Sequence, residues 1–343
     1  MKRQGRPFAV PLQAQPGLFV QLISLLCLLL LAGCGEAPAV FEPRGPAARS
    51  IANLGWFLIV AGTIVYVAVM GIVAFALLRS RQREFGLHPS FGPRMILFGG
   101  IVIPALILLA VYALTFNTLR ALSTPAIDEA LHIHVVGRQW WWEVQYPRQQ
   151  FETANELHIP VGHPVLITLT SQDVIHSFWV PELHGKLDLV PGDVNTIWIQ
   201  ADEPGIYWGE CAEFCGIQHA NMRFLVVAEP EADYAAWLAA QQQPAAEPAD
   251  AQAQQGLRVF LEADCIECHT IRGTNATGDL GPDLTHLVSR HTLGAGMLAN
   301  NRGNLGGWIA DPQHIKPGAL MPPAQDLTGP DLQALLAYLA TLK

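Results

Sequence analysis

Two cysteines, a histidine and a methionine lie close together near the middle of the chain. They are Cys211, Cys215, His219 and Met222, in the stretch Cys-Ala-Glu-Phe-Cys-Gly-Ile-Gln-His-Ala-Asn-Met. Soft sulfur ligands select copper, zinc or iron–sulfur clusters, imidazole suits copper and zinc, and a weak Met ligand is typical of electron-transfer copper sites. A second histidine, His176, lies 35 residues before the first cysteine, as expected if a separate loop closes the site. The cysteine pair alone could form a disulfide or half a zinc site, but the full set predicts copper.

A second motif follows nearer the C-terminal end. Cys265-Ile-Glu-Cys268-His269 is the C-x-x-C-H pattern of c-type haem attachment, in which two thioether bonds fix the porphyrin and the histidine binds iron. Three fixed positions can match by chance, so the surroundings matter. A helical stretch over residues 253–261 precedes the motif, and an amphipathic segment over residues 330–342 closes the chain, as in a small cytochrome c.

The haem iron needs a sixth ligand, and Met/His ligation is the cytochrome c arrangement. Met321 is the better candidate because the prolines beside it make its approach rigid, whereas Met297 in a Gly-rich loop is the alternative. Three other histidines of this region are expected at the surface and not at iron: His286, His291 and His314.

With its upstream histidine, the first motif resembles the binuclear copper (CuA) centre of cytochrome c oxidase subunit II. The resemblance implies two bridging thiolates, one imidazole on each copper ion, a weak thioether and a backbone carbonyl, which are Cys211 and Cys215, His176 and His219, Met222, and Glu213. It also implies a magnesium ion, shared with the large subunit, on the side chain of Glu213. Together with the haem motif, the resemblance is to the caa3-type oxidases, whose subunit II carries a fused cytochrome c domain.

Residues 121–230 are expected to form the copper domain. Short β-branched and alternating runs lie between Pro and Gly turn signals, which favours an all-β sandwich. The domain resembles a cupredoxin. By the same resemblance Trp140, in a run of three tryptophans, is the candidate entry point for electrons, although such aromatics also anchor small cores. Asp188 aligns with an acidic position near the subunit interface and could equally be a solvated loop charge.

The pattern of the N-terminal segment indicates a targeting signal. Basic residues precede an apolar run over residues 18–31, which ends in Leu-Ala-Gly-Cys34. This resembles a bacterial lipoprotein signal over residues 1–33, with lipid attached to Cys34 of the mature chain. The alternative is an uncleaved signal anchor with an ordinary buried cysteine.

Residues 34–120 are expected to form a membrane anchor with a two-helix transmembrane hairpin. Two apolar segments, over about residues 51–78 and 95–116, each reach the roughly 20 residues that a spanning helix needs, and neither contains a charged residue or histidine. Four arginines lie in the loop between them, which places that loop in the cytoplasm. We therefore expect a bacterial inner-membrane protein whose redox domains lie on the outer, periplasmic face.

The lack of histidines in these two segments bears on mechanism. A membrane-embedded oxygen site of haem and copper needs imidazole ligands, so oxygen reduction must belong to a partner. The resemblance implies that the partner is the haem–copper subunit I, together with subunit III. Family members often carry a glutamate where Leu97 stands here, so no proton-uptake role is carried over to this chain.

A linker over residues 231–255 is expected to join the copper domain to an all-α cytochrome c domain over residues 256–343. The copper domain has 14 acidic against 4 basic residues, and the cytochrome domain has 8 against 6. The cytochrome is therefore not a basic partner steered onto an acidic face, and we expect the tether to replace long-range attraction. Internal haem-to-copper transfer should then change little with salt. Nothing in the chain is basic enough to suggest nucleic-acid binding.

These observations predict an electron-transfer subunit that passes electrons from haem c to CuA and on to a proton-pumping oxidase. The external donor is expected to be a cytochrome c or a quinol–cytochrome c reductase. Two alternatives remain at this stage. One is an electron-input subunit of a nitric oxide reductase, and the other is a membrane-anchored redox carrier without an enzyme partner.

Overall fold

The computed structural model describes residues 39–79, 91–123 and 131–343. The predicted signal and the predicted lipid site at Cys34 lie outside the described residues. The same is true of most of the arginine-containing loop between the two apolar segments.

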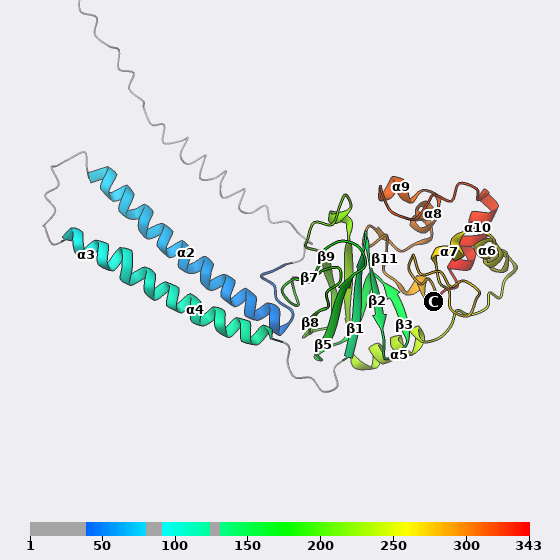
Figure 1. The fold of residues 1–343 in the computed structure, drawn as a ribbon, viewed down its shortest axis with the longest axis horizontal. Coiled ribbons are helices and arrows are strands. Elements are labelled where there is room, and N and C mark those ends of the chain that lie inside the picture. Colours follow the sequence, from blue (N-terminus) through cyan, green and yellow to red (C-terminus); the bar gives the residue numbers. More distant parts are fainter. Residues whose placement is uncertain (1–38, 80–90, 124–130) are drawn as a thin grey trace, which may run out of the picture. The chain divides into compact units, whose positions relative to one another are not determined.

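Two long apolar helical segments open the described chain. Helix α2 spans Pro46–Arg79, and the second segment runs through α3 (Phe91–Leu97), a π-helical turn η1 (Phe98–Val102) and α4 (Ile103–Leu122). Both are long and apolar enough to cross a membrane, and α2 and α4 lie side by side in Figure 1. The π-helical turn ends two residues before Pro104, which has no backbone N–H to donate to the preceding turn.

The start of α2 packs against the domain that follows. Ala47, Ala48 and Ala52 are buried there, and Arg49 pairs with Asp202 at 2.6 Å. A side chain at Gly45 would lie 2.3 Å from the carbonyl oxygen of Gln200. Small residues therefore allow the helix to begin directly on the surface of the next domain.

Ten strands form a sandwich of two five-stranded sheets. The strand orders are β3-β2-β1-β5-β8 and β4-β10-β9-β6-β7, with β1 and β5 parallel in the first sheet and β10 and β4 parallel in the second. The strands are β1 Leu131–Arg138, β2 Trp141–Tyr146, β3 Phe151–Ala154, β4 Glu156–Pro160, β5 Val165–Ser171, β6 His176–Trp179, β7 Leu187–Leu189, β8 Asn195–Ile199, β9 Gly205–Cys211 and β10 Arg223–Glu229. This confirms the predicted all-β sandwich.

The sandwich core follows from alternation along the strands. In β5, Val165, Ile167 and Leu169 are buried while the residues between them are only partly covered. Trp142 lies at the centre, with its ring centroid 5.1 Å from that of Phe224. The first and last tryptophans of the sequence run thus differ, since Trp142 is a core residue and Trp140 only packs against the core.

The predicted linker over residues 231–255 contains helix at both ends. Helix α5 (Glu231–Gln241) packs on the sandwich through Trp237, whose ring stacks on His158 at a centroid distance of 4.0 Å. The last residues of the predicted linker belong to α6 (Ala251–Glu262), whose first turn is capped by the Asp250 side chain. Only residues 242–250 connect the two helices.

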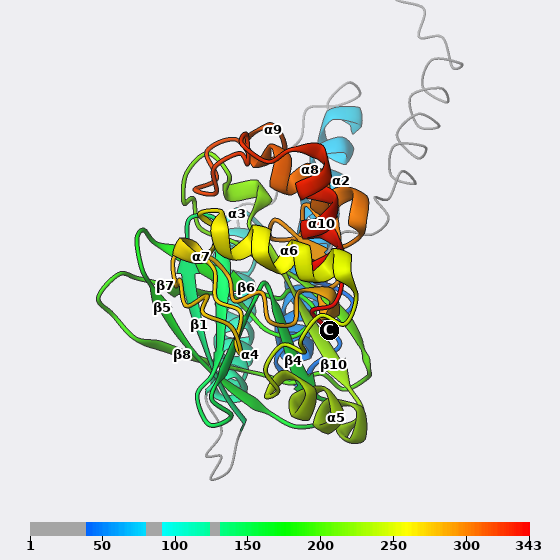
Figure 2. The same cartoon turned by 90° about the vertical axis from the view of Figure 1, so that its right-hand side faces the viewer.

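The C-terminal region is mainly helical, as predicted, with one short ribbon. Its elements are α6, α7 (Cys265–Cys268), η3 (Leu287–Ser289), β11 (Thr292–Leu293), β12 (Leu298–Ala299), α8 (Arg302–Ala310), α9 (Pro312–Ile315) and α10 (Gly329–Leu339). Helices α6 and α10 pack against each other, as Figure 2 shows. A Cβ atom at Gly256 would lie 2.0 Å from the carbonyl oxygen of Ala334, so this close crossing requires glycine.

Candidate metal and haem sites

Neighbouring strands of the second sheet bring the sulfur and imidazole groups together. His176 is the first residue of β6 and Cys211 is the last residue of β9. The two strands pair antiparallel, with Phe178 opposite Cys211. The loop after β9 turns back over the strand ends through η2 (His219–Asn221) before β10 begins. The sandwich therefore fixes one histidine and one cysteine, and the loop supplies the other groups.

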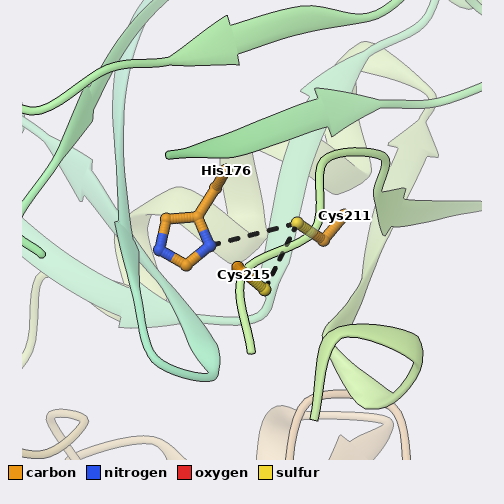
Figure 3. Close-up of side chains that lie close together, drawn as sticks. All are labelled: His176, Cys211 and Cys215. Atoms are coloured by element: carbon orange, nitrogen blue, oxygen red, sulfur yellow. Dashed lines mark hydrogen bonds between the residues drawn. The ribbon is translucent and has the colours of Figure 1, made fainter. Parts of the chain in front are cut away.

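The first three donors converge on one point. The Sγ atom of Cys211 lies 3.9 Å from Nδ1 of His176 and 3.8 Å from Sγ of Cys215, as Figure 3 shows. All three ligand atoms lie within 4.8 Å of one another, and all three residues are buried. A disulfide has a sulfur–sulfur distance of about 2.05 Å, so the cysteines are a pair of free thiols here and the disulfide alternative does not apply.

The other three predicted donors surround the same two sulfur atoms. Nδ1 of His219 and Sδ of Met222 each lie 3.8 Å from Sγ of Cys215. The carbonyl oxygen of Glu213 lies 3.2 Å from Sγ of Cys211. A single tetrahedral zinc ion takes four ligands. Six donors around a shared sulfur pair fit two ions bridged by the thiolates better than they fit one.

The electrostatics of this site favour a cation. Hydrogen bonding to Cys215, and less strongly to His176, lowers the pKa of the Cys211 thiol to about 3, although burial opposes the shift. The neighbouring Cys211 and burial raise the pKa of Cys215. One thiolate therefore forms easily and the second is held back beside it, so that a bound metal cation would relieve the repulsion.

Asp173 is a functional residue that sequence reasoning missed. Its Oδ1 atom lies 2.8 Å from Nε2 of His176. This hydrogen bond fixes the ring and leaves Nδ1 directed at the sulfur pair, as carboxylates behind metal-binding histidines commonly do. Burial works to lower the pKa of His176, but the bonds to Cys211 and Asp173 outweigh it and the pKa is raised. The sequence feature that could have identified Asp173 is its position three residues before His176, in the loop that leads into β6.

Trp140 contacts the metal-binding loop directly. Its Nε1 atom donates to the carbonyl oxygen of Cys215 at 2.9 Å, and the side-chain amide of Gln139 donates to the same oxygen at 2.7 Å. Gly216 has φ +118°, and a side chain there would lie 2.9 Å from the indole ring. The loop conformation and the close approach of the indole both depend on this glycine. Gln139 was not predicted from the sequence.

The haem motif occupies its own short helix in the C-terminal region. Cys265 and Cys268 begin and end α7, and His269 follows directly. Nδ1 of His269 lies 2.8 Å from the carbonyl oxygen of Pro282, which fixes the tautomer and leaves Nε2 available for iron. Burial lowers the pKa of His269 and favours the neutral imidazole that binds metal. A side chain at Gly281 would lie 2.7 Å from the ring, so glycine is needed beside it.

The two candidate sixth ligands lie in different settings. Met321 packs against the hydrophobic core of the cytochrome region, and its carbonyl oxygen accepts from the Gln313 side chain at 3.0 Å. Met297 follows Gly296, which packs against Arg223 of the copper domain. These settings favour Met321.

The structure places two other residues singled out from the sequence, Asp188 and His286, in different surroundings. Asp188 and Glu213 are joined by Lys186, whose Nζ atom lies 3.5 Å from a carboxylate oxygen of each. The expectation that His286 lies at the surface is wrong, because the residue is 6% exposed. Its Nε2 atom lies 3.0 Å from the carbonyl oxygen of Gln243. It therefore links the beginning of the connecting segment, residues 242–250, to the cytochrome region.

Comparison with known proteins identifies both domains. The family described as cytochrome c oxidase subunit II, periplasmic domain, matches residues 148–229, and the cytochrome c family matches residues 253–343. Cytochrome c oxidase subunit 2 of Alkalihalophilus pseudofirmus is 38% identical over 331 residues, which are 94% of this chain and 96% of that protein. The subunit of the same name from Bacillus subtilis is 30% identical over 351 residues, which are 94% of this chain and 98% of that protein.

A solved structure of a periplasmic domain of cytochrome oxidase subunit II, from Bradyrhizobium japonicum, is also similar. It is 30% identical, covers 34% of this chain and 96% of that chain, and has a TM-score of 0.33. The fold and the two motifs define a membrane-anchored redox protein with a copper domain and a c-type cytochrome domain. Its domains are of the type found on the outer face of the membrane. The chain belongs to the cytochrome c oxidase subunit 2 family.

Proposed function

We propose that this chain is the electron-input subunit of a caa3-type cytochrome c oxidase. Electrons enter at a c-type haem, pass to a binuclear copper centre and leave for a haem in the large subunit, where oxygen is reduced. The observation that carries the proposal is the convergence of four further donors on one pair of thiols, in a chain that also carries a C-x-x-C-H helix. This chain transfers electrons, and oxygen reduction takes place in the partner subunit.

Each donor has a distinct role at the copper pair. The thiolates of Cys211 and Cys215 and the imidazoles of His176 and His219 would hold the two copper ions. Met222 would supply the weak thioether ligand that tunes electron-transfer copper sites. The strand ends keep these side chains in place, so that a bound copper pair would exchange an electron with little rearrangement of the protein. The remaining donor is the Glu213 carbonyl.

Cys265 and Cys268 would hold the haem covalently, and His269 and Met321 would bind its iron. A Met/His pair raises the haem potential relative to two histidines. Trp140 is the proposed route from the cytochrome to the copper pair, because its indole N–H is bonded to the backbone of a copper ligand.

The membrane topology and the partners follow from the same proposal. Helices α2 and α3–α4 would cross a bacterial inner membrane as a hairpin and pack against subunit I, with subunit III in the same complex. Cys34 would carry lipid, and the external donor would be a cytochrome c or a quinol–cytochrome c reductase. A magnesium ion on Glu213 would have to displace the Lys186 ammonium, which holds that carboxylate now.

The competing functions receive less support. Relatives named as oxidase subunits match the chain over 94% of its length, which does not favour a nitric oxide reductase subunit. A free carrier would not need two apolar helices in addition to a lipid anchor.

A reduced-minus-oxidised optical spectrum of the complex purified through this chain tests the proposal when read together with oxygen uptake. An a-type haem band beside the c-type band, with oxygen uptake, is expected. Haem c with only b-type haem and no uptake would indicate a nitric oxide reductase. Haem c without any partner would indicate a carrier.

A further inference from the structure

Two charged side chains are buried where the cytochrome region meets the copper domain. Lys316 of the cytochrome region is 3% exposed, and Glu156 of the copper domain is 2% exposed. Charged residues are almost never fully buried unless they are paired or fully hydrogen-bonded. Neither residue takes part in the copper or haem site described above, so each needs an explanation of its own.

Lys316 is enclosed by three carbonyl oxygens, two of which belong to the copper domain. Its Nζ atom donates to Trp140 at 2.7 Å, to Asn221 at 2.7 Å and to Gly294 at 2.9 Å. Three acceptors use all three N–H groups of an ammonium ion, whereas a neutral amine has only two. Burial lowers the pKa of Lys316 to about 7, but three carbonyl acceptors favour the charged form. The cytochrome region thus places an ammonium group against the backbone of Trp140 and of the residue before Met222.

Glu156 is the reciprocal case, an anion of the copper domain satisfied by the cytochrome region. Its Oε1 atom accepts from the backbone N–H of His291 at 2.6 Å and of Thr292 at 3.0 Å. Its Oε2 atom lies 2.9 Å from Nδ1 of His291. All of these partners belong to the other region, so the carboxylate would lose them together if the two regions separated.

Neutral contacts between these two points make the surfaces complementary. The backbone N–H of Arg223 donates to the carbonyl oxygen of Ala295 at 3.1 Å, and the Gln218 side chain donates to that of Pro317 at 2.7 Å. A Cβ atom at Gly318 would lie 2.7 Å from Ile217 and 3.4 Å from the Trp140 ring. The segment that leads to Met321 therefore passes directly over Trp140.

We propose that the cytochrome region is held on the electron-entry face of the copper domain by the reciprocal buried charges Lys316 and Glu156, and remains there between turnovers. The proposal rests on the proposed function for the meaning of that face. Opening the interface would leave both charges without their protein partners, and truncating one partner of a buried hydrogen-bonded charge is costly. The connecting segment then acts as a covalent link between docked regions and not as a swinging arm.

This arrangement has a consequence for electron delivery. The face around Trp140 is covered by residues 316–318 of the same chain. An external donor would therefore reduce the haem and would have no access to Trp140. Internal transfer would also be insensitive to salt, because buried pairs are screened far less than exposed ones.

Cleavage of the connecting segment in the intact oxidase tests the docking. A protease site is inserted between Ala246 and Glu247, both exposed, and the purified complex is cleaved and washed at about 0.5 M salt, where the Debye length is well below 10 Å. The measurement is the fraction of c-type haem absorbance that stays with the complex. The native interface should retain most of it after cleavage.

Matched variants identify the groups responsible. Lys316→Met with Glu156→Gln should weaken retention of the cleaved cytochrome region at least about tenfold, since each substitution removes a buried charge from its hydrogen-bond partners. Arg258→Met with Glu262→Gln removes one exposed cation and one exposed anion from α6 and should retain haem like the native chain. The c-type and copper absorption bands before cleavage show that each variant is folded and loaded.

Each result has a definite meaning. If the native complex loses its haem domain as completely as the Lys316/Glu156 variant, the docking proposal is wrong. If that variant retains the domain like the native chain, the two charges are not what holds it. If the uncleaved native complex has no c-type band, the proposed function itself fails, which is a different outcome from loss after cleavage.

Discussion

The copper centre and the haem site are built in different ways within one chain. The copper donors come from strand ends and one loop over a closed core, and His176, Cys211 and Cys215 are nearly fully buried. Cys265 and Cys268 lie on the four-residue helix α7 and are only partly buried. The first site is held by sandwich packing and by hydrogen bonds to its loop, whereas the second would gain apolar contact from a covalently attached haem. Copper should therefore load a finished site, while haem should complete a fold.

The largest expected effect is on the cytochrome region. Cys265→Ser with Cys268→Ser removes both haem attachment points. The small helical core should then lose most of its stability, because several of its apolar residues, Met321 among them, are only partly buried. Limited proteolysis should digest residues beyond about 251 and leave the sandwich intact. A resistant cytochrome region in this variant would show that haem does not complete the fold.

The corresponding change at the copper centre should abolish function with little effect on folding. Cys215→Ser removes one bridging thiolate, so copper binding and electron transfer to the oxidase should be lost. The sandwich core around Trp142 is unchanged, and the unfolding midpoint of the copper domain should shift by only a few degrees, about 1 kcal/mol or so. Copper content and circular dichroism melting measure the two effects separately. Unfolding of the sandwich in this variant would show that the copper domain does not fold independently of its metal.

A single glycine tests how closely packed the cytochrome region is. Gly256→Ala should destabilise it by about 1–3 kcal/mol, because the new methyl group would meet the Ala334 carbonyl and helices α6 and α10 would have to separate. Gly307→Ala in α8 is the matched control, since nothing lies within 4 Å of the added atom. That change should stabilise the helix slightly, by about 0.5–1 kcal/mol. Denaturant unfolding followed at the haem band measures both.

Substitution of Asp173, whose carboxylate is hydrogen-bonded to His176, should have a moderate effect on copper affinity. Asp173→Asn keeps the side-chain volume but replaces the carboxylate that orients His176. Copper affinity should fall about 10- to 100-fold, as is usual when such an outer partner is changed. Competition with a copper chelator gives the affinity. Asp193→Asn, a change at an exposed carboxylate of the same domain, should leave it unchanged.

The two motifs are visible in the sequence itself, and the sandwich and the helical C-terminal region could be predicted from it because each depends on a local pattern. Strand alternation, long apolar segments and the spacing of cysteines and histidines are visible along the chain. The hydrogen bonds of Asp173 and Gln139 were missed because a single polar residue in a loop carries no pattern. The burial of Glu156, His286 and Lys316 was missed for a further reason. Their side-chain partners lie 22 residues or more away in the sequence, in contacts that no local signal defines.

The smallest expected effect concerns pH and the contact between the two regions. Hydrogen bonding to the Glu156 carboxylate raises the pKa of His291, with Glu229 adding to the shift and burial opposing it. A histidine whose folded pKa is raised contributes stability that is fully present below its ordinary pKa of about 6.5 and is lost as pH rises through the raised value. The contribution of His291 to retention of the cleaved cytochrome domain should therefore weaken modestly from about pH 6 towards pH 8. Burial lowers the pKa of Lys316 to about 7, so this second group should act in the opposite direction above that pH.

The size of that effect follows from exposure. The His291 side chain is 42% exposed, so solvent screens the pair and the change should amount to less than about 1 kcal/mol. His291→Asn keeps the backbone N–H that Glu156 accepts from and removes only the titrating ring. The retention of the native chain relative to that of this variant should therefore fall as pH rises over the same range. A native chain whose retention strengthened with rising pH would show that the contact is governed by another group, and the buried Lys316 would then be the first to test.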